Sequence, residues 1–354
     1  MLDHPSKSSA MKLLASSFLP RTAVIALVVV GLTSCHLSSL TIWSPAPAPP
    51  TAVFEVERVR DVAYYDGPDA DGFRHRLDLY LPKGKKDYPV VVLVHGGAWI
   101  MSDKRHFGLV SSVGEFLASQ GIGAVLPNYR LSPAVKHPEH IKDVARAVAW
   151  TKAHIAERGG CADQMFLAGH SAGGHLVSLL ATDDSYLKAV GVPPTDIKGV
   201  ISVSGIYRIP PGSLGITLNG DTSTAFRLDE LRPLRGEGGW FTSMLSGKSN
   251  IPLNVNLYGP AFGDDPQIRK KASPIEHVHL GLPPFLLVSA EKDLPTLPGM
   301  AEEFHKALLS FGCEAQYLQV EKRNHNSVMY SAIDSEDFVA RAMLEFIRRY
   351  SGRR

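Results

Sequence analysis

A serine framed by glycines is the first feature of the sequence whose residue types could do chemistry. Residues 169–173 read Gly-His-Ser-Ala-Gly, which fits the pattern G-x-S-x-G around Ser171. The apolar residues 165–168 before it are typical of a buried strand, and a helical pattern follows from Gly174. A sharp strand-to-helix turn would push the serine hydroxyl outward, and the glycines provide the backbone room for such a turn. The pattern therefore predicts that Ser171 is a nucleophile.

A second glycine-containing turn lies upstream of this serine. Residues 95–99 read His-Gly-Gly-Ala-Trp and follow the apolar run 90–94. Small residues just past a strand let backbone N–H groups point into a cleft, where each donor can lower the barrier to forming an oxyanion by about 3–4 kcal/mol. An isolated Gly-Gly pair is more simply a tight turn. Because the serine motif is also present, we interpret this segment as an oxyanion hole.

The two motifs together resemble those of the α/β-hydrolase fold, specifically the carboxylesterases related to hormone-sensitive lipase. The His-Gly-Gly-Ala-Trp form at 95–99 is most similar to that of the bacterial feruloyl and acetyl esterase-like group, and of kynurenine formamidase-like and isoprenylcysteine methylesterase-like enzymes. The resemblance covers about residues 55–350 and includes Asn-Tyr-Arg-Leu-Ser-Pro at 128–133 and Ala-Ser-Pro-Ile at 272–275. Ala98 stands where lipase-like members carry a third glycine.

The resemblance implies a Ser-Asp-His triad in that chain order. Asp293 occupies the acid position in the turn after the strand expected at 285–288, with Glu291 as the alternative if the register of the turn differs. His325 lies in the family's histidine loop after the strand expected at 315–320. Ser171 would attack a carbonyl, His325 would move the proton, and Asp293 would orient the imidazole.

The same resemblance implies that the oxyanion is held by the backbone N–H groups of Gly97, Ala98 and Ala172. His170 and His175 flank the nucleophile, but their spacing excludes them as its base. The sequence His-Pro-Glu-His at 137–140 has the wrong spacing for a helical zinc pair and favours a polar helix start. We expect neither a metal nor a cofactor.

Alternating strand and helix patterns predict the α/β class. Short apolar runs recur at 90–94, 123–126, 165–168, 199–203, 285–288 and 315–320, and helical patterns lie at 138–158, 301–309 and 336–349. This alternation predicts a mostly parallel sheet with helices on both faces. Residues 74–81 alternate in polarity and read as an antiparallel edge strand. All four motifs then fall at the carboxyl ends of strands, where open parallel sheets place their sites.

A long insertion, residues 207–275, separates the sixth and seventh strands. It far exceeds an ordinary connection, and such segments are more often lids or binding loops than disorder. Trp99, Trp240 and Phe241 could line a substrate pocket, although the aromatic residues of the insertion could equally pack it down. The basic run 269–271 reads as a solvated face.

The N-terminus has the features of an export signal. A basic flank precedes an apolar run at 22–32, which is too short to span a bilayer and ends in small residues before Cys35. Residues 32–35 resemble a bacterial lipobox, so we expect a lipoprotein signal at 1–34, a Pro-rich linker at 35–54 and a catalytic domain at 55–354. Acylated Cys35 would anchor the protein to a bacterial membrane on the periplasmic or cell-surface side. The alternative is soluble export with Cys35 as a bystander.

Charge and cysteine content exclude several classes of binding partner and site. The formal net charge is +2, which argues against a nucleic-acid partner. Three cysteines are too few for a disulfide framework or a four-thiolate zinc site. In the family's strand order Cys161 and Cys313 would lie about 14 Å apart, so we expect two free thiols.

The function favoured by these residues is hydrolysis of carboxylic esters through an acyl-enzyme. An amidase or formamidase with the same triad is one alternative. A surface binding module that kept the fold without its chemistry is another, although such proteins usually lose a triad member.

Overall fold

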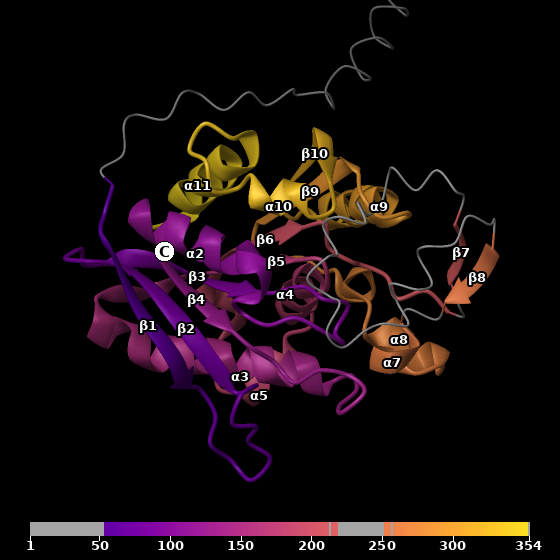
Figure 1. Ribbon diagram of the computed structural model, residues 1–354, viewed down its shortest axis with the longest axis horizontal. Coiled ribbons are helices and arrows are strands. Elements are labelled where there is room, and N and C mark those ends of the chain that lie inside the picture. Colours follow the sequence, from indigo (N-terminus) through magenta and orange to yellow (C-terminus); the bar gives the residue numbers. More distant parts are fainter. Residues whose placement is uncertain (1–52, 212–213, 219–250, 256–257, 353–354) are drawn as a thin grey trace, which may run out of the picture. The chain divides into compact units, whose positions relative to one another are not determined.

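An eight-stranded sheet forms the centre of the computed structural model, which describes residues 53–211, 214–218, 251–255 and 258–352 (Figure 1). β2 runs antiparallel to its neighbours β1 and β4, and every other adjacent pair is parallel. The predicted mostly parallel sheet is therefore confirmed. Across the sheet lie, in order, β1 (Val56–Ala63), β2 (Arg76–Pro82), β4 (Gly123–Pro127), β3 (Tyr88–Val94), β5 (Gly160–His170), β6 (Ile197–Val203), β9 (Phe285–Lys292) and β10 (Ala315–Asn324).

Helices cover both faces of this sheet, as the sequence predicted. The helices are α2 (Leu109–Ser119), α3 (Glu139–His154), α4 (Ala172–Thr182), α5 (Ser185–Ala189), α7 (Gly259–Phe262), α8 (Pro266–Lys271), α9 (Leu297–Ser310), α10 (Ser327–Tyr330) and α11 (Phe338–Tyr350). Short 3₁₀ helices lie at His106–Gly108, Ile155–Arg158, Pro194–Asp196 and Pro274–His277. α2 and α11 lie on the face opposite to α3 (Figure 1).

Alternation along the strands explains the two covered faces. Val90 and Val92 of β3 belong to one hydrophobic cluster with the buried side chains of α3, α4 and α9. On the other face, the ring of Phe166 in β5 lies 6.4 Å from that of Phe346 in α11. Because successive side chains of a strand point to opposite faces, an unbroken apolar run marks a strand that is buried on both.

The predicted edge strand is wrong in its position. The segment forms β2, but β1 pairs along its outer side, so β2 is the second strand and β1 is the edge. Both faces of β2 are buried, including the carboxylate of Asp78, which accepts hydrogen bonds from Arg105 at 2.6 and 2.9 Å. The polar alternation arose from a buried ion pair rather than from exposure to solvent.

The insertion lies between β6 and β9, the sixth and seventh strands of the main sheet, as predicted. It contributes a separate antiparallel pair, β7 (Leu214–Leu218) and β8 (Ile251–Val255). Arg269 joins its two ends, because its guanidinium donates to the carbonyl oxygens of Pro210 at 2.7 Å and Gly263 at 2.8 Å. Arg269 is 1% exposed, so the prediction of a solvated face is wrong for this residue.

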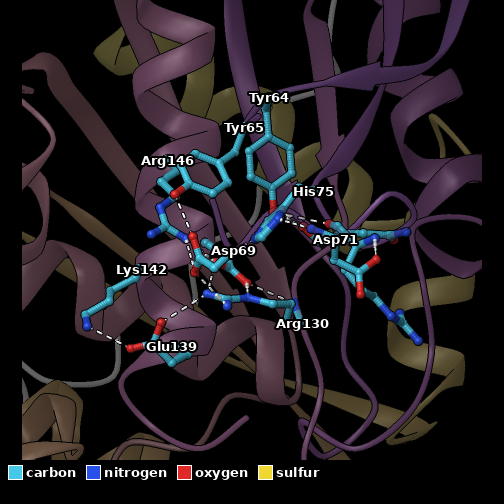
Figure 2. Close-up of polar contacts among 12 residues, drawn as sticks. Tyr64, Tyr65, Asp69, Asp71, His75, Arg130, Glu139, Lys142 and Arg146 are labelled. Carbon is cyan, nitrogen blue, oxygen red and sulfur yellow. Dashed lines mark hydrogen bonds and ion pairs between the residues drawn. The ribbon is translucent and has the colours of Figure 1, made fainter. Parts of the chain in front are cut away.

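A buried carboxylate ties the loop between β1 and β2 to α3. Asp143 accepts hydrogen bonds from Arg130 at 2.8 Å and Arg146 at 2.9 Å, and His75 Nε2 lies 3.0 Å from its Oδ1. His75 Nδ1 accepts the Asp71 N–H, so the ring proton sits on Nε2, facing the carboxylate. Figure 2 shows Arg130, Arg146 and His75 converging from these segments. The cluster fixes the chain that leaves β4.

Contacts divide the chain into two units, Met1–Ala46 and Pro47–Arg354, and every described residue belongs to the second. None of the helices in the described ranges is both long and apolar enough to cross a bilayer. Cys161 and Cys313 are both free thiols, which confirms that prediction. Cys35, Trp240 and Phe241 lie outside the described residues.

Candidate active site

Ser171 sits in a strained turn between β5 and α4. Its backbone angles are φ 56° and ψ −119°, a region that a residue with a side chain rarely occupies. The turn is tight because Gly173 packs on the backbone of Val94, where an added Cβ would collide with the Val94 carbonyl oxygen. Ser171 is 8% exposed. The sequence prediction of a strand, a sharp turn and a helix around this serine is confirmed.

The loop after β3 fixes the direction of two peptide groups. Gly97 and Ala98 have φ angles of 104° and 50°. The Gly96 carbonyl oxygen accepts hydrogen bonds from His95 Nδ1 at 2.8 Å and Tyr129 Oη at 3.3 Å. The Gly97 carbonyl oxygen accepts two backbone N–H groups from further along the loop, each at 3.0 Å. Because N–H and C=O point in opposite directions in a trans peptide, the N–H of Gly97 points away from the His95 ring and Tyr129, and the N–H of Ala98 points away from the two loop N–H groups.

These N–H groups lie beside the nucleophile. Gly96 packs against Ser171 so closely that a Cβ on Gly96 would lie 3.1 Å from Ser171 Cβ. Ala172 is the first residue of α4, where N–H groups have no partner within the helix. Within the described ranges, no hydrogen bond is made by the N–H of Gly97, Ala98 or Ala172. These three N–H groups, predicted from the sequence to hold an oxyanion, are therefore without a hydrogen-bond partner in the described structure.

The carboxylate of Asp293 is held by four donors at the end of β9. Oδ1 accepts from His325 Nδ1 at 2.6 Å and from the Leu294 N–H at 2.8 Å. Oδ2 accepts from Ser204 Oγ at 2.5 Å and from the Ala290 N–H at 3.1 Å. Burial by itself would raise the pKa of Asp293, but the hydrogen bonds from His325 and Ser204 and the charge of the imidazole outweigh it, and the pKa is lowered. The carboxylate is ionised at neutral pH.

The structure resolves the choice between the two acidic residues of this turn. Glu291, the alternative acid, instead accepts the backbone N–H of Lys322 at 2.6 Å and is exposed. Asp293 alone of the two contacts the imidazole of His325. This contact is the one that the predicted register of the acid turn requires.

His325 follows β10 in a loop that its neighbours pin. The Asn324 N–H donates to Ser327 Oγ at 2.8 Å, and the Ser327 N–H donates back to Asn324 Oδ1 at 2.8 Å. Because ionised Asp293 can only accept, His325 carries a proton on Nδ1 and Nε2 is its basic atom. In the described structure Nε2 makes no hydrogen bond to Ser171 Oγ, a contact that often tightens only when substrate is bound.

The two histidines beside the nucleophile are buried and neutral. Burial, reinforced by the nearby His325, lowers the pKa of His170 to about 3, and burial lowers the pKa of His175 to about 3. His170 Nε2 donates to the backbone carbonyl of His325, and His175 Nε2 donates to that of Ala272, each at 2.7 Å. Neither contact makes them the base, in agreement with the sequence prediction.

Trp99 lies in the core and is 2% exposed. Its ring packs edge-on against Phe262 at 4.8 Å and His175 at 5.0 Å. A role for Trp99 in a substrate pocket stays a prediction. His140, from the motif weighed as a metal clip, meets Ser132 Oγ at 3.0 Å, and the described residues hold no group of three or more ligating side chains that could bind a metal.

Sequence reasoning missed two supporting residues, Ser204 and Tyr129. Ser204 reaches Asp293 across 89 positions of the chain, and Tyr129 reaches Gly96 across 33. Neither pairing leaves a local pattern. The one available signal was the position of both residues just after a strand, because parallel strands β4, β6 and β9 bring their carboxyl ends to the same edge.

Comparisons with known proteins agree with this geometry. Residues 77–208 match the family model BD-FAE. The chain is 28% identical over 304 residues to Esterase LipQ of Mycobacterium tuberculosis, covering 83% of this chain and 63% of that protein. It is 26% identical to kynurenine formamidase of Danio rerio, covering 82% and 85%. Among solved structures, esterase B of Lactobacillus rhamnosis superposes with a TM-score of 0.60 at 19% identity over 93% of each chain.

The chain spans less than two thirds of the length of the curated esterase that it matches over 304 residues. The similarity to solved structures shows the fold, and the sequence matches show which proteins this chain is similar to. Together they show that this chain has the α/β-hydrolase fold and that its sequence is similar to those of an esterase and a formamidase.

Proposed function

We propose that this protein is a serine hydrolase that cleaves carboxylic esters. The observation that carries the proposal is the pairing of His325 Nδ1 with ionised Asp293 at 2.6 Å, beside a serine held in a strained turn. This pairing leaves Nε2 of His325 as the basic nitrogen that can accept the Ser171 proton. Backbone N–H groups of the neighbouring loop would stabilise the negative charge that forms on the substrate oxygen.

The reaction follows from these positions. Ser171 Oγ attacks the ester carbonyl carbon while its proton passes to His325 Nε2, and the negatively charged oxygen is held by the N–H groups of Gly97, Ala98 and Ala172. The tetrahedral species then expels the alcohol, which takes the proton from His325. Water repeats the sequence on the acyl-enzyme: its proton passes to His325 and then to Ser171, and the carboxylic acid leaves.

Hydrolysis of p-nitrophenyl acetate tests this function. The wild-type protein should release p-nitrophenol, and Ser171→Ala should lower kcat by several orders of magnitude. A wild-type protein without turnover on esters graded by acyl length would contradict the proposal. The control is Ser178→Ala, which removes a buried hydroxyl that makes no hydrogen bond in the described part of the chain.

Amide cleavage is the second candidate, because the match to kynurenine formamidase covers 85% of that enzyme. The same triad can attack an amide when the leaving amine is protonated by His325. A comparison of kcat/KM for N-formyl-kynurenine and p-nitrophenyl acetate decides between the two. Faster turnover of the formamide would make the protein a formamidase.

We also propose that the catalytic domain is exported and anchored by lipid. The support is the sequence: a short apolar segment and a lipobox-like run end at Cys35, and the composition of the Pro-rich stretch 44–50 is typical of a stiff spacer before the domain at 55–354. Two acyl chains hold a protein at a membrane where one does not. Labelling with a palmitate analogue should mark the wild type and not Cys35→Ala; label that survives the substitution would contradict the anchor.

The insertion 207–275 is proposed to select the acyl or alcohol group, with Trp240, Phe241 and Trp99 as candidate pocket residues. The support is its position: residue 207 follows the carboxyl end of β6, and the N–H of Ile275, at the other end of the insertion, donates to the Tyr207 carbonyl oxygen at 3.1 Å. Trp240→Ala and Phe241→Ala should change the ranking of esters by chain length more than kcat for the acetate ester. An unchanged ranking would exclude a pocket role.

A further inference from the structure

His170 connects the nucleophile to the loop of the catalytic histidine. It immediately precedes Ser171, and its Nε2 lies 2.7 Å from the backbone carbonyl oxygen of His325, across 155 positions of the chain. A carbonyl oxygen only accepts, so Nε2 carries the ring proton. The rings of His170 and His325 are tilted at 45° with centroids 4.7 Å apart. His170 is 2% exposed, so water does not compete for this hydrogen bond.

The same ring also borders the oxyanion loop. A Cβ on Gly96 would lie 3.3 Å from His170 Nδ1 and 2.9 Å from the His170 carbonyl oxygen. One buried imidazole therefore touches the three segments that must meet for reaction: the serine turn, the oxyanion loop and the histidine loop.

Asp293 by itself does not fix the imidazole of His325. The hydrogen bond to Nδ1 is a single contact at one ring atom, and the hydrogen bonds between Asn324 and Ser327 hold the flanking loop but not the His325 peptide itself, so the ring keeps some freedom to pivot. A second fastening at the backbone carbonyl removes that freedom, because it holds the other end of the same residue. A misplacement of about 1 Å in such a site can cost about a hundredfold in rate.

We propose that His170 is a positioning residue that fastens the backbone of His325, and with it the imidazole, beside the turn that carries Ser171. The inference deepens the proposed hydrolase function and rests on it for its kinetic test. His170 does not exchange a proton with substrate. It acts through the backbone of His325, and it stays neutral, so it adds no charge beside the imidazolium that forms during the reaction.

His175 offers a matched control. It is also buried, and its Nε2 also donates to a backbone carbonyl at 2.7 Å, but that carbonyl belongs to Ala272 and not to a residue of the triad. Loss of either hydrogen bond should lower stability by a similar amount. Only the loss of the first should disturb the position of His325.

The experiment compares His170→Met and His170→Gln with His175→Met. Methionine fills the space without a donor, and glutamine carries an amide N–H at nearly the position of Nε2. With p-nitrophenyl acetate, His170→Met should lower kcat about 10- to 100-fold with KM changed less than about threefold. His170→Gln should recover kcat to within about fivefold of wild type, and His175→Met should leave kcat within about twofold. Equal losses in His170→Met and His175→Met, or no recovery with glutamine, would overturn the inference.

A second measurement does not depend on turnover. In protein labelled with ¹⁵N-histidine, the low-field Nδ1 proton of the His325–Asp293 pair should shift or broaden in His170→Met and remain in His170→Gln and His175→Met. An unchanged Nδ1 proton signal in His170→Met would overturn the positioning role of His170, whether or not the wild type hydrolyses esters. A wild type that is inactive on esters would contradict the proposed hydrolase function and not this role. If His170→Met does not fold, His170→Asn, whose amide is too short to reach the carbonyl, should give the same changes.

Discussion

Ser204, at the end of β6, donates its hydroxyl proton to Oδ2 of Asp293 at 2.5 Å, on the side of the carboxylate away from His325. Ser204 has a φ of +50°, a costly backbone conformation for a residue with a side chain, and is 1% exposed. The carboxylate of Asp293 is therefore oriented from both of its oxygens. This relationship predicts an effect on rate from a residue outside the triad.

Replacing Ser204 with alanine removes one of the two donors to Oδ2. We expect kcat to fall about 3- to 10-fold with little change in KM, because a hydrogen bond to a charged group contributes about 1.5–3 kcal/mol, part of which the Ala290 N–H retains. Steady-state kinetics on a p-nitrophenyl ester measure the effect. Unchanged kcat in a folded Ser204→Ala protein would show that Asp293 is held without this hydroxyl.

Tyr129→Phe tests the support of the oxyanion loop. The Tyr129 hydroxyl lies 3.2 and 3.3 Å from the carbonyl oxygens of His95 and Gly96, so its loss should let the N–H of Gly97 drift. We expect kcat to fall about 2- to 10-fold, a fraction of the effect of losing a whole oxyanion donor. Tyr207→Phe is the matched control, since this equally buried tyrosine donates instead to Ser202 Oγ. Equal losses of kcat in Tyr129→Phe and Tyr207→Phe would indicate a general loss of stability and not a specific effect on the oxyanion loop.

Asp143→Asn tests the buried ion cluster of Figure 2. The substitution leaves Arg130 and Arg146 facing a neutral amide, and breaking one partner of a buried ion pair costs about 3–5 kcal/mol. Because the side chains of Arg130 and Arg146 are 12% and 23% exposed to solvent, we expect the loss of unfolding free energy to lie toward the lower end of this range. Urea unfolding measures it. A free energy of unfolding within about 0.5 kcal/mol of wild type would contradict a stabilising role for this cluster.

The pH dependence of stability follows from five histidines, four buried and one, His137, partly buried. Burial lowers the pKa values of His95, His137 and His140 to about 4 and those of His170 and His175 to about 3. In the unfolded chain a histidine has a pKa near 6.5, so below that value the unfolded state binds protons that the folded state refuses. Stability should be full above about pH 6.5 and fall as the pH drops toward 4.

Unfolding in urea between pH 7 and pH 4.5 measures this slope. The free energy of unfolding should change less steeply with pH in His175→Gln than in the wild type. The difference should correspond to about one fewer proton taken up on unfolding, because that variant lacks one of the five histidines. A flat stability curve over this range would contradict the assignment of these histidines as neutral in the folded protein.

The candidate triad could be predicted because each of its residues lies in a local pattern next to a strand that resembles the corresponding motif of the family. Ser171, Asp293 and His325 could be named without knowing which strands are neighbours. The roles of Ser204 and Tyr129 depend on the order β4-β3-β5-β6-β9, which no single segment encodes. Periodicity misplaced the edge of the sheet because Asp78 is a buried charge paired with Arg105, and a polar side chain on a strand reads as solvent-facing. Arg269 was misread for the same reason, since its charge is buried between the two ends of the insertion.

The most direct test of the account is covalent capture of the nucleophile by a fluorophosphonate, followed by peptide mass spectrometry. An activated serine attacks the phosphorus and keeps the phosphonyl group, whereas ordinary serines do not react. The account predicts a single adduct on Ser171 in the wild type, slower labelling in His325→Ala and none in Ser171→Ala. A wild-type protein that folds but carries no adduct, or carries it on another serine, would contradict the account.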